Sequence, residues 1–435
     1  MTSNRYQNDL ITVDSFLNSE YDGVFYLGHA SIIAKISGKN FLFDYVKDDF
    51  PYGDRWRFFP PLIQDIPLNR IDGIFVSHMH QDHFDSTFLT RDDIDCQIYV
   101  IGWRDSFEEV MDRHGIKRIN IPAQKKFEIA PGVYVFGFMH QDNGVDASCC
   151  IGNLNFSVYH GNDNYLTNEL LQGRDPEFFD IDVACIPYAY INWYPQLLEN
   201  LSNEEKSCES KRLTELYFEY AIEQANQLNA KQVIPFGANL IYRDSARSPL
   251  NSECKTPLDF EYYVRGKMGK GQAQRVKAIF GGDSITKESG VLVIRSADLY
   301  DSETYRTQMQ VFLDASNSPL ESKTAIKLDE LDFLPSIKIK TPTPYEHYVC
   351  VQLVGREIGV MINTADSSVA ALNIEYLIKN CFDYHVINIS NQDLFFKWVE
   401  GKIRMEEIIG SREFSIYRRP NTYDKHVLFI ATTQL

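Results

Sequence analysis

The sequence concentrates metal-binding residue types in one short stretch, VSHMHQDHFD, at residues 76–85. His78 and His80 lie two residues apart, so an extended segment points both imidazoles to the same side. Asp82 and His83 follow at once, and a turn there would let them face a second cation beside the first. Imidazole nitrogens and carboxylate oxygens bind the same divalent ions. The spacing therefore predicts a site for one or two metal ions rather than a hydrated histidine-rich loop.

The apolar run before this stretch predicts where the site lies. Residues 71–76, IDGIFV, read as a short buried strand that ends at Val76 or Ser77. In α/β sheets, ligand sites lie outside the carboxyl ends of the strands. We therefore expect the histidine-rich loop at one edge of a sheet.

Strands dominate the first part of the chain, and helices interleave with them. Residues 24–45 predict a hairpin, because two apolar runs flank the turn signal SGKN. Residues 104–114 and 209–228 predict helices, the second of them amphipathic. Further strands are expected at 96–102, 117–121, 125–130, 132–139, 146–151, 154–160, 181–189 and 232–237. This order predicts a layered α/β fold with both sheet faces covered.

The motif at His78, His80, Asp82 and His83 resembles the H-x-H-x-D-H signature of metallo-β-lactamase-fold proteins. The resemblance extends over residues 22–285. It implies a four-layered αββα sandwich that carries a mono- or dinuclear metal centre along one edge. Asp44, in FLFDY, matches the acid that supports the ligand loop in that family.

The same resemblance implies two further ligands at the ends of later strands. His140, in YVFGFMHQDNGVD, matches the family's next histidine. Asp163, in FSVYHGNDNY, matches the carboxylate that bridges two ions, although Asn162 stands where the family usually has glycine. His160 lies on the same turn and is expected to orient a ligand or a bound water. The implied metal ligands are His78, His80, Asp82, His83, His140 and Asp163.

The chain departs from the family at the last ligand, which is commonly a histidine in Pro-x-His after a late strand. Residues 233–239 read VIPFGAN, and no histidine occurs between His160 and His347. Either the second ion loses an imidazole or another group replaces it, and the candidates are Asn239, Asp244, Asp283 and His29. His29, in YLGHAS, lies in the first hairpin near the same edge. We therefore predict catalytic roles for Asp82, His160 and His29.

A domain boundary is expected near residue 290. It divides the chain into a metal-binding catalytic domain, 1–290, and a smaller C-terminal α+β domain, 291–435. The segment FFKWVEGKIRMEEIIGSREFSIYRRPNTYDKHVLFI resembles the tail of the hydroxylase branch that includes CMP-N-acetylneuraminate hydroxylase-like proteins, although this chain has no Rieske-type C-x-H. The alternative is a packing domain that exposes Arg412, Arg418 and Arg419.

Three classes of function fit these residues. Histidine and carboxylate ligands with open positions suit ferrous iron and dioxygen, so we prefer a non-haem diiron mono-oxygenase or hydroxylase of a small organic substrate. Its electrons would come from a separate donor protein. The alternative enzyme is a zinc- or manganese-dependent hydrolase of a lactone, amide, thioester or phosphoester. The third class keeps the metal for structure alone, but such an ion prefers a closed Cys/His cage.

Two long aromatic-rich segments, 188–208 and 238–275, are expected to be lids or substrate walls. An arginine beside an aromatic slot suits a carboxylate or phosphate on an organic body. The alternative is ordinary loop packing with surface arginines. The predicted wall residues are Tyr188, Tyr190, Trp193 and Tyr194 in the first segment and Tyr242, Arg243 and Arg247 in the second.

The overall charge limits the partners. The 435 residues carry a formal charge of −17, which argues against nucleic acid or an anionic membrane as the main partner. None of the eight cysteines stands in C-x-x-C or C-x-H spacing, so reduced thiols are expected. The start, MTSNRYQNDL, lacks a signal-peptide core, and no apolar run reaches the ~20 residues of a membrane span, so we expect a cytoplasmic protein. Whether it forms a homo-oligomer is left open.

Overall fold

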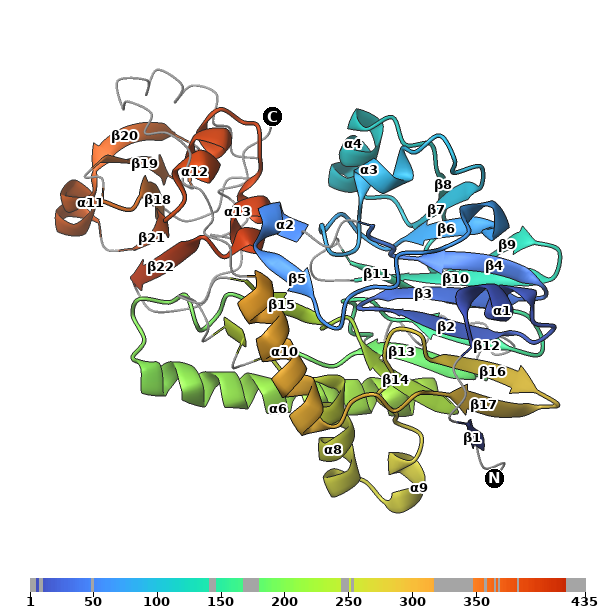
Figure 1. Ribbon diagram of the computed structural model, residues 1–435. Helices are drawn as coiled ribbons and strands as arrows, with labels where there is room; N and C mark the ends of the chain where they lie inside the picture. Colours follow the sequence, from blue (N-terminus) through green and yellow to red (C-terminus); the bar gives the residue numbers. More distant parts are fainter. Residues whose placement is uncertain are drawn as a thin grey trace. The chain divides into compact units, whose positions relative to one another are not determined.

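The computed structural model describes most of the chain, shown as a ribbon in Figure 1. The described residues are 5–7, 11–47, 51–140, 146–166, 180–243, 250–251, 254–316, 347–355, 358–363, 365–366, 368–381 and 383–419. They form two compact units, the first drawn from 1–191, 213–243 and 251–316 and the second from 192–212, 244–250 and 317–435. In this described part, no helix combines the length and the apolar content that crossing a membrane requires.

The first unit contains two sheets that carry the chemistry-bearing residues at their edges. A nine-stranded sheet has the order β1-β17-β16-β2-β3-β4-β6-β7-β8, and a six-stranded sheet has the order β14-β13-β12-β11-β10-β9. The strands of the first sheet are β1 (Arg5–Gln7), β2 (Gly23–Gly28), β3 (Ser31–Ile36), β4 (Lys39–Phe43), β6 (Gly73–Val76), β7 (Gln97–Ile101), β8 (Ile119–Ile121), β16 (Ser284–Glu288) and β17 (Val291–Arg295). Those of the second are β9 (Lys126–Ala130), β10 (Val133–Met139), β11 (Ala147–Gly152), β12 (Ser157–His160), β13 (Val183–Pro187) and β14 (Gln232–Phe236).

Strand pairing explains why the ligand loop lies at a sheet edge. Strands β4, β6 and β7 run parallel, so their carboxyl ends meet on one side of the sheet. The predicted hairpin turn at SGKN is confirmed between β3 and β4, but the apolar run before it forms two antiparallel strands, β2 and β3, that turn at His29 and Ala30. Every residue of β3 is buried, including Lys35, whose Nζ donates a hydrogen bond of 2.8 Å to the Leu17 carbonyl. Strand β17 lies beyond the predicted boundary at 290, yet it pairs with β16 and extends this sheet.

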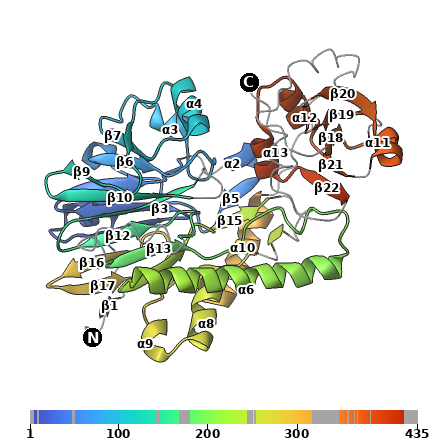
Figure 2. The same cartoon turned by 180° about the vertical axis from the view of Figure 1, so that it is seen from behind.

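Helices cover both outer faces of the paired sheets, as Figures 1 and 2 show. Phe43, Ile101 and Val135 belong to the core between the sheets. Helices α1 (Val13–Asn18), α3 (Ser86–Leu89) and α4 (Asp105–Arg113) pack on the outer face of the nine-stranded sheet. Helices α6 (Asn203–Leu228) and α8 (Pro257–Lys267) pack on the outer face of the six-stranded sheet. The predicted four-layered αββα sandwich is confirmed.

Two segments differ from the sequence prediction. Helix α6 begins at Asn203, inside the segment 188–208 that was expected to be a loop, and acidic Glu204 and Glu205 favour its first turn. The segment 238–275 holds β15 (Leu240–Tyr242), α8 and α9 (Lys270–Ala273), and Thr256 caps α8 in a capping box with Asp259. Strand β15 pairs with β5 (Trp56–Phe58) in a separate ribbon. The remaining elements are α2 (Pro51–Asp54), the 3-10 turn Leu68–Arg70 and α10 (Ser302–Ser316).

The second unit is built on a five-stranded sheet of order β20-β19-β18-β21-β22. Its core surrounds Trp398, which is fully buried with Phe395 and Phe414. The elements are β18 (Tyr348–Leu353), β19 (Ile358–Asn363), β20 (Val369–Asn373), α11 (Ile374–Asn380), β21 (Tyr384–Ile389), α12 (Gln392–Val399), α13 (Met405–Ser411) and β22 (Phe414–Arg419). This is the predicted α+β composition.

The two sheets of the first unit approach closely where β10 crosses β7. A Cβ placed on Gly137 would overlap the Cγ2 of Ile101, so glycine is required for steric reasons at this point. The carbonyl of Gly137 also accepts a hydrogen bond of 2.7 Å from the Gln124 amide. Any larger residue must push apart the edge of the sandwich that carries the metal-binding loop.

We expect Gly137→Ala to lower the free energy of unfolding by about 1–3 kcal/mol, because it overpacks the interface between the sheets. Chemical denaturation should show this loss. In an Ile101→Ala background the clashing methyl is gone, and the same substitution should cost much less. Gly266→Ala on helix α8 is the matched control, since a Cβ there meets no atom within 4 Å. Equal costs of Gly137→Ala in both backgrounds would contradict this account of the packing.

Candidate metal centre

The carboxylate of Asp44 connects the end of β4 to the loop that follows β6. One oxygen, Oδ1, accepts a hydrogen bond from the Ser77 amide at 2.8 Å. The other, Oδ2, accepts from the Ser77 hydroxyl at 2.6 Å and lies 2.9 Å from His83 Nδ1. Asp44 is 1% exposed and has a φ of +41°, a backbone conformation that aspartate tolerates better than most residues. Asp44 therefore fixes the start of the ligand loop and the ring of His83.

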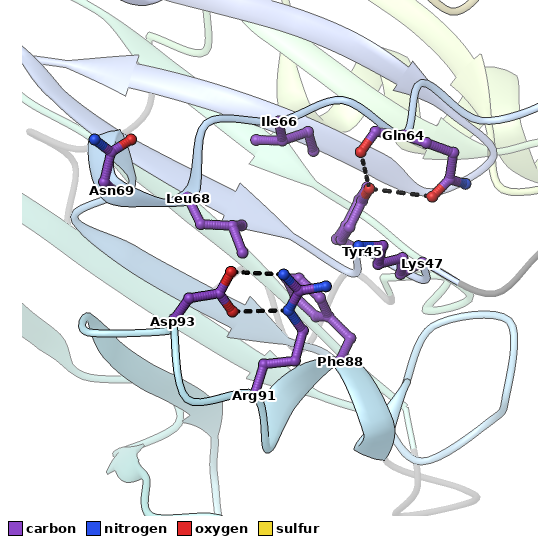
Figure 3. Close-up of a pocket in the computed structure, with 9 residues that line it drawn as sticks. All are labelled: Tyr45, Lys47, Gln64, Ile66, Leu68, Asn69, Phe88, Arg91 and Asp93. Carbon is purple, nitrogen blue, oxygen red and sulfur yellow. Dashed lines mark hydrogen bonds and ion pairs between the residues drawn. The ribbon is translucent and has the colours of Figure 1, made fainter.

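Tyr45, which follows Asp44 in the sequence, is also held by contacts with other segments. Tyr45 donates a hydrogen bond of 2.9 Å to the Gln64 carbonyl, and its ring packs edge-on against Phe88. It lines a surface cavity of about 260 Å³ beside the Arg91–Asp93 ion pair, shown in Figure 3. Tyr45, the residue directly after Asp44, is thus held in place, and this restrains the position of Asp44.

A turn in the loop brings its later residues back toward the earlier ones. The amides of His83 and Phe84 donate to the His80 carbonyl at 2.9 and 2.8 Å. The rings of His78 and His83 then lie 4.3 Å apart between centroids. The predicted turn after His80 is confirmed, and it places two imidazoles on one side of the loop.

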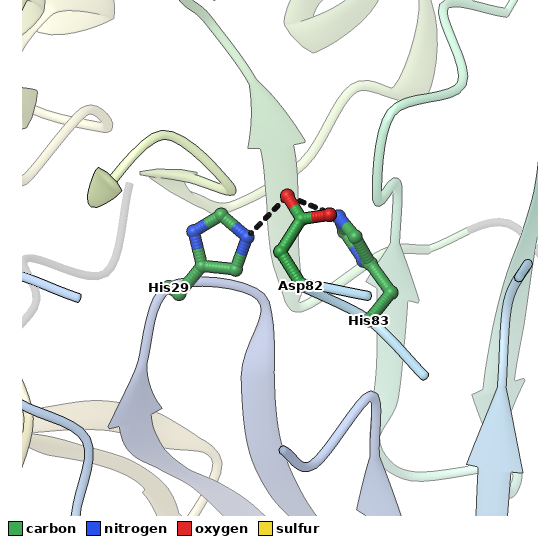
Figure 4. Close-up of side chains that lie close together, drawn as sticks. All are labelled: His29, Asp82 and His83. Atoms are coloured by element: carbon green, nitrogen blue, oxygen red, sulfur yellow. Dashed lines mark ion pairs between the residues drawn. The ribbon is translucent and has the colours of Figure 1, made fainter. Parts of the chain in front are cut away.

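Among the residues that the structure describes, three groups of side chains have ligand atoms close enough to hold a metal ion. The first group is His78, His80 and Asp146, and the second is His29, Asp82 and His83. The third is His78, His83 and Asp163, so Asp163 lies between members of the other two groups. Figure 4 shows the second group, with Asp82 between the imidazoles of His29 and His83. Two ions could therefore bind side by side at this cluster, with Asp163 between them.

The distances between these atoms fit metal ligands better than direct hydrogen bonds. Asp82 Oδ2 lies 3.4 Å from His29 Nε2 and 3.7 Å from His83 Nε2. Asp163 Oδ2 lies 3.6 Å from His83 Nε2 and 3.7 Å from His78 Nε2. Two ligand atoms about 2.1 Å from one ion at a tetrahedral angle lie about 3.4 Å apart. His78 Nε2 and His80 Nδ1 are closer, at 2.7 Å, as two imidazoles that share a proton would be.

Burial adds a second test of whether these residues fit a metal. The imidazoles of His29, His78 and His83 are fully buried. Both ring nitrogens of His29 and Nε2 of His83 make no hydrogen bond within the described part of the chain. Buried polar atoms without a partner are costly, and metal coordination would satisfy them. The donor set therefore fits divalent ions.

Charges within the cluster shift its titrations in opposite directions. Burial alone would lower the pKa of His83, but the carboxylates of Asp163, Asp82 and Asp44 raise it to about 10. Burial and the nearby His83 and His80 hold the pKa of His78 well below its usual range. Partial burial, with the charges of Asp146 and Asp82, raises the pKa of Asp163 against the opposing effect of His83. Without metal, the cluster therefore holds protons that an ion would displace.

Asp146 is a candidate ligand that the sequence reasoning did not select. It lies across the β10–β11 hairpin from His140, whose amide donates to the Asp146 carbonyl at 2.9 Å. Its carboxylate comes within 3.7 Å of His78 Nε2, whereas none of the three groups contains His140. A ligand from this hairpin could be expected from the sequence, but which strand supplies it depends on the hairpin pairing. The role of His140 stays a prediction.

His160 and Asn162 lie next to the cluster of candidate ligands. His160 lies 2.9 Å from the Ala30 carbonyl through Nε2 and stacks on Phe43, a packed position beside the cluster. Asn162, with a φ of +46°, makes the turn that presents Asp163, which explains why asparagine can stand in the family's glycine position.

Of the candidates to replace the missing late histidine, His29 is the one that belongs to a group of possible metal ligands in the described part of the chain. His29 joins the cluster from the turn between β2 and β3. Asp283 instead accepts hydrogen bonds from the Phe280 amide and the Ser296 hydroxyl. Asn239 is buried, and its carbonyl accepts from the Phe59 amide. Asp244 lies outside the described residues.

Gly237 occupies the position that a histidine of Pro-x-His would fill. Its φ is +80°, and the nearest atom to an added Cβ is Asp163 Oδ1, at 3.8 Å. Its amide donates to the His29 carbonyl at 3.1 Å. Open space thus replaces an imidazole beside Asp163, and His29 approaches the second ion site from a different strand pair.

The predicted substrate-wall residues are mostly packed. Tyr188 is fully buried between α6 and α8 and donates to the Lys255 carbonyl, while Tyr190 packs against Tyr217. Tyr242 is buried edge-on against Trp56, and Arg243 is 8% exposed. Trp193 lies in the core of the second unit, where Tyr194 packs against it and faces Arg418. Arg247 lies outside the described residues.

The sequence matches no family model and no curated protein. Solved structures similar to the chain include the metallo-hydrolase Igni18 of Ignicoccus hospitalis, with 18% identity and a TM-score of 0.42 over 61% of this chain and 98% of that one. CmlA, a diiron β-hydroxylase of Streptomyces venezuelae, has 18% identity and a TM-score of 0.38 over 58% and 52%. YhfI of Bacillus subtilis, a metallo-β-lactamase-fold protein, has 12% identity and a TM-score of 0.35 over 54% and 92%. The layer order and the position of the H-x-H-x-D-H loop, described above, are those of the metallo-β-lactamase fold.

Proposed function

We propose that this chain is a dinuclear metalloenzyme, and specifically a non-haem diiron oxygenase of a small organic substrate. One observation carries the proposal. Two groups, each of two imidazoles and one carboxylate, flank Asp163: His78, His80 and Asp146 on one side, and His29, Asp82 and His83 on the other. Two histidines and one carboxylate with open positions are typical of ferrous iron in enzymes that use dioxygen.

Iron in these positions would let the enzyme reduce dioxygen, placing one oxygen atom in the substrate and releasing the other as water. Two electrons and two protons must be supplied, and a separate electron-donor protein is the proposed source. The chain's own residues hold the ligands in place. Asp44 orients His83, and the buried imidazoles exclude water from one side of the centre.

The open face of the centre lies at Asp163. Its side chain is 37% exposed, whereas the imidazoles of His78 and His83 are fully buried. The space beside Gly237 adjoins the same carboxylate. We therefore place the small-molecule substrate on this side.

A hydrolase is the second candidate function for the same set of ligands. Two histidines and a carboxylate also hold zinc in hydrolases, where the ion activates a water. This enzyme would use zinc or manganese and would act on a lactone, amide, thioester or phosphoester.

The activity of iron-loaded protein separates the two proposals. We expect protein loaded anaerobically with ferrous iron alone to bind about two iron ions per chain and to consume dioxygen, because the ligand set suits ferrous iron. Zinc is kept out of the loading, since it binds the same ligand types more tightly than ferrous iron does. Elemental analysis measures the ions, and an oxygen electrode measures dioxygen uptake after chemical reduction. No oxygen uptake by the iron-loaded protein, together with hydrolysis of a lactone or phosphoester by zinc-loaded protein, would support the hydrolase instead.

The ligand from the β10–β11 hairpin can be identified by paired substitutions. We expect Asp146→Ala to weaken the first ion's binding by more than the about 10–100-fold that loss of a supporting hydrogen bond costs. His140→Ala is compared with it, because the sequence assigns the hairpin ligand to His140. His114→Ala, at an exposed position after α4, is the control. Titration calorimetry gives the affinities, and loss of an ion from His140→Ala alone would instead support the assignment from the sequence.

Metal binding should depend on pH in a defined direction. Below about pH 10, His83 holds a proton that an ion must displace, so affinity should rise about tenfold per pH unit between pH 6 and 8. Calorimetry in two buffers of different ionisation enthalpy measures the released protons. Affinity that does not change with pH would contradict the charge state derived for the metal-free site.

The proton on His83 should make the stability of the metal-free protein fall as the pH rises, whereas metal affinity should increase. The raised pKa of His83 stabilises the fold fully below its ordinary value of 6.5, and this contribution is lost as the pH rises to about 10. The melting temperature of metal-free protein should therefore fall across that window. His83→Gln should remove most of this fall.

A further inference from the structure

Tyr52 reaches the metal centre from outside the ligand motif. It lies on α2 (Pro51–Asp54), and its phenol donates a hydrogen bond of 3.1 Å to Asp82 Oδ1. Its backbone amide donates to Gln81 Oε1 at 2.6 Å. One residue is thus joined to two successive residues of the ligand loop, once through its backbone and once through its side chain.

The phenol contacts only one of the two Asp82 oxygens. The other oxygen, Oδ2, faces His29 Nε2 at 3.4 Å and His83 Nε2 at 3.7 Å. A carboxylate can rotate and exchange its oxygens, and a hydrogen bond to Oδ1 opposes that rotation. The phenol therefore keeps Oδ2 directed at the second ion site.

The backbone of Tyr52 supports the same interpretation. Its φ is +56°, which is uncommon for a bulky residue and persists where the surroundings hold it. The bond from its amide to Gln81 is one such restraint. Because Tyr52 is only partly buried, packing alone is a weak reason to keep a large aromatic residue in this conformation.

We propose that Tyr52 is a positioning residue of the metal centre, which selects the oxygen of Asp82 that faces the ion held with His29 and His83. This inference rests on the proposed function, because it assumes that this group binds an ion. It predicts that removing the phenol loosens one of the two ions and leaves the other nearly unchanged.

The test compares Tyr52→Phe with Tyr263→Phe and the wild-type chain. Tyr263 is the matched control, because its phenol also donates to a carboxylate, Glu219, at 2.6 Å on the helical surface. We expect Tyr52→Phe to weaken the binding of one Co²⁺ ion by about 10–100-fold and to shift the visible absorption of the loaded protein. Tyr263→Phe should bind both ions as the wild type does.

A second variant keeps the inference testable if the first unfolds. Gln81→Leu retains the phenol but removes the acceptor of the Tyr52 amide, so it should weaken the same ion in the same direction. Affinities and spectra equal to those of the wild type in both variants would overturn the role of Tyr52 while leaving the metalloenzyme proposal intact. A wild-type chain that binds fewer than two Co²⁺ ions would overturn the proposed function itself.

Discussion

The buried carboxylate of Asp44 is the contact on which the site depends. It satisfies the amide and hydroxyl of Ser77 and the Nδ1 of His83 at once, so one residue fixes both ends of the ligand loop. Its own position follows from the parallel pairing of β4 and β6, continued by the bond from the Asp44 amide to the Phe75 carbonyl at 3.0 Å. With Nδ1 occupied, the Nε2 of His83 is left to face the centre.

Charge balance shapes the centre as much as geometry does. Asp44, Asp82, Asp146 and Asp163 gather around a few imidazoles, a set that would repel itself without compensating positive charge. Arg104 supplies part of that charge from a buried position and donates to the Ser77 carbonyl at 2.7 Å. Burial lowers the pKa of Arg104 to about 10, so the guanidinium remains charged at neutral pH. Two divalent ions would supply the remainder.

The chain's departure from the ligand pattern of metallo-β-lactamase-fold proteins has a local structural counterpart. Gly237 leaves open space where an imidazole would approach Asp163, and its backbone bonds to that of His29. His29 approaches Asp82 from the β2–β3 turn, with a φ of +49°. The group of His29, Asp82 and His83 therefore contains two histidines, and a Cβ added at Gly237 would meet no atom closer than 3.8 Å. The second unit has its own hydrophobic core around Trp398.

The sequence alone determined the local features: the apolar strand before His78, the turn after His80, the helix at 105–113 and the layer composition. These follow from short-range spacing and hydrophobic periodicity, which a single chain displays directly. Only the tertiary structure selected Asp146 at the hairpin, His29 for the second ion and Tyr52 as the partner of Asp82. Each choice depends on pairing between distant segments or on an unusual backbone angle. Contacts between distant segments and unusual backbone angles leave no local pattern in the sequence. Such a contact depends on how the whole chain folds, and the residue types next to each partner in the sequence do not reveal it.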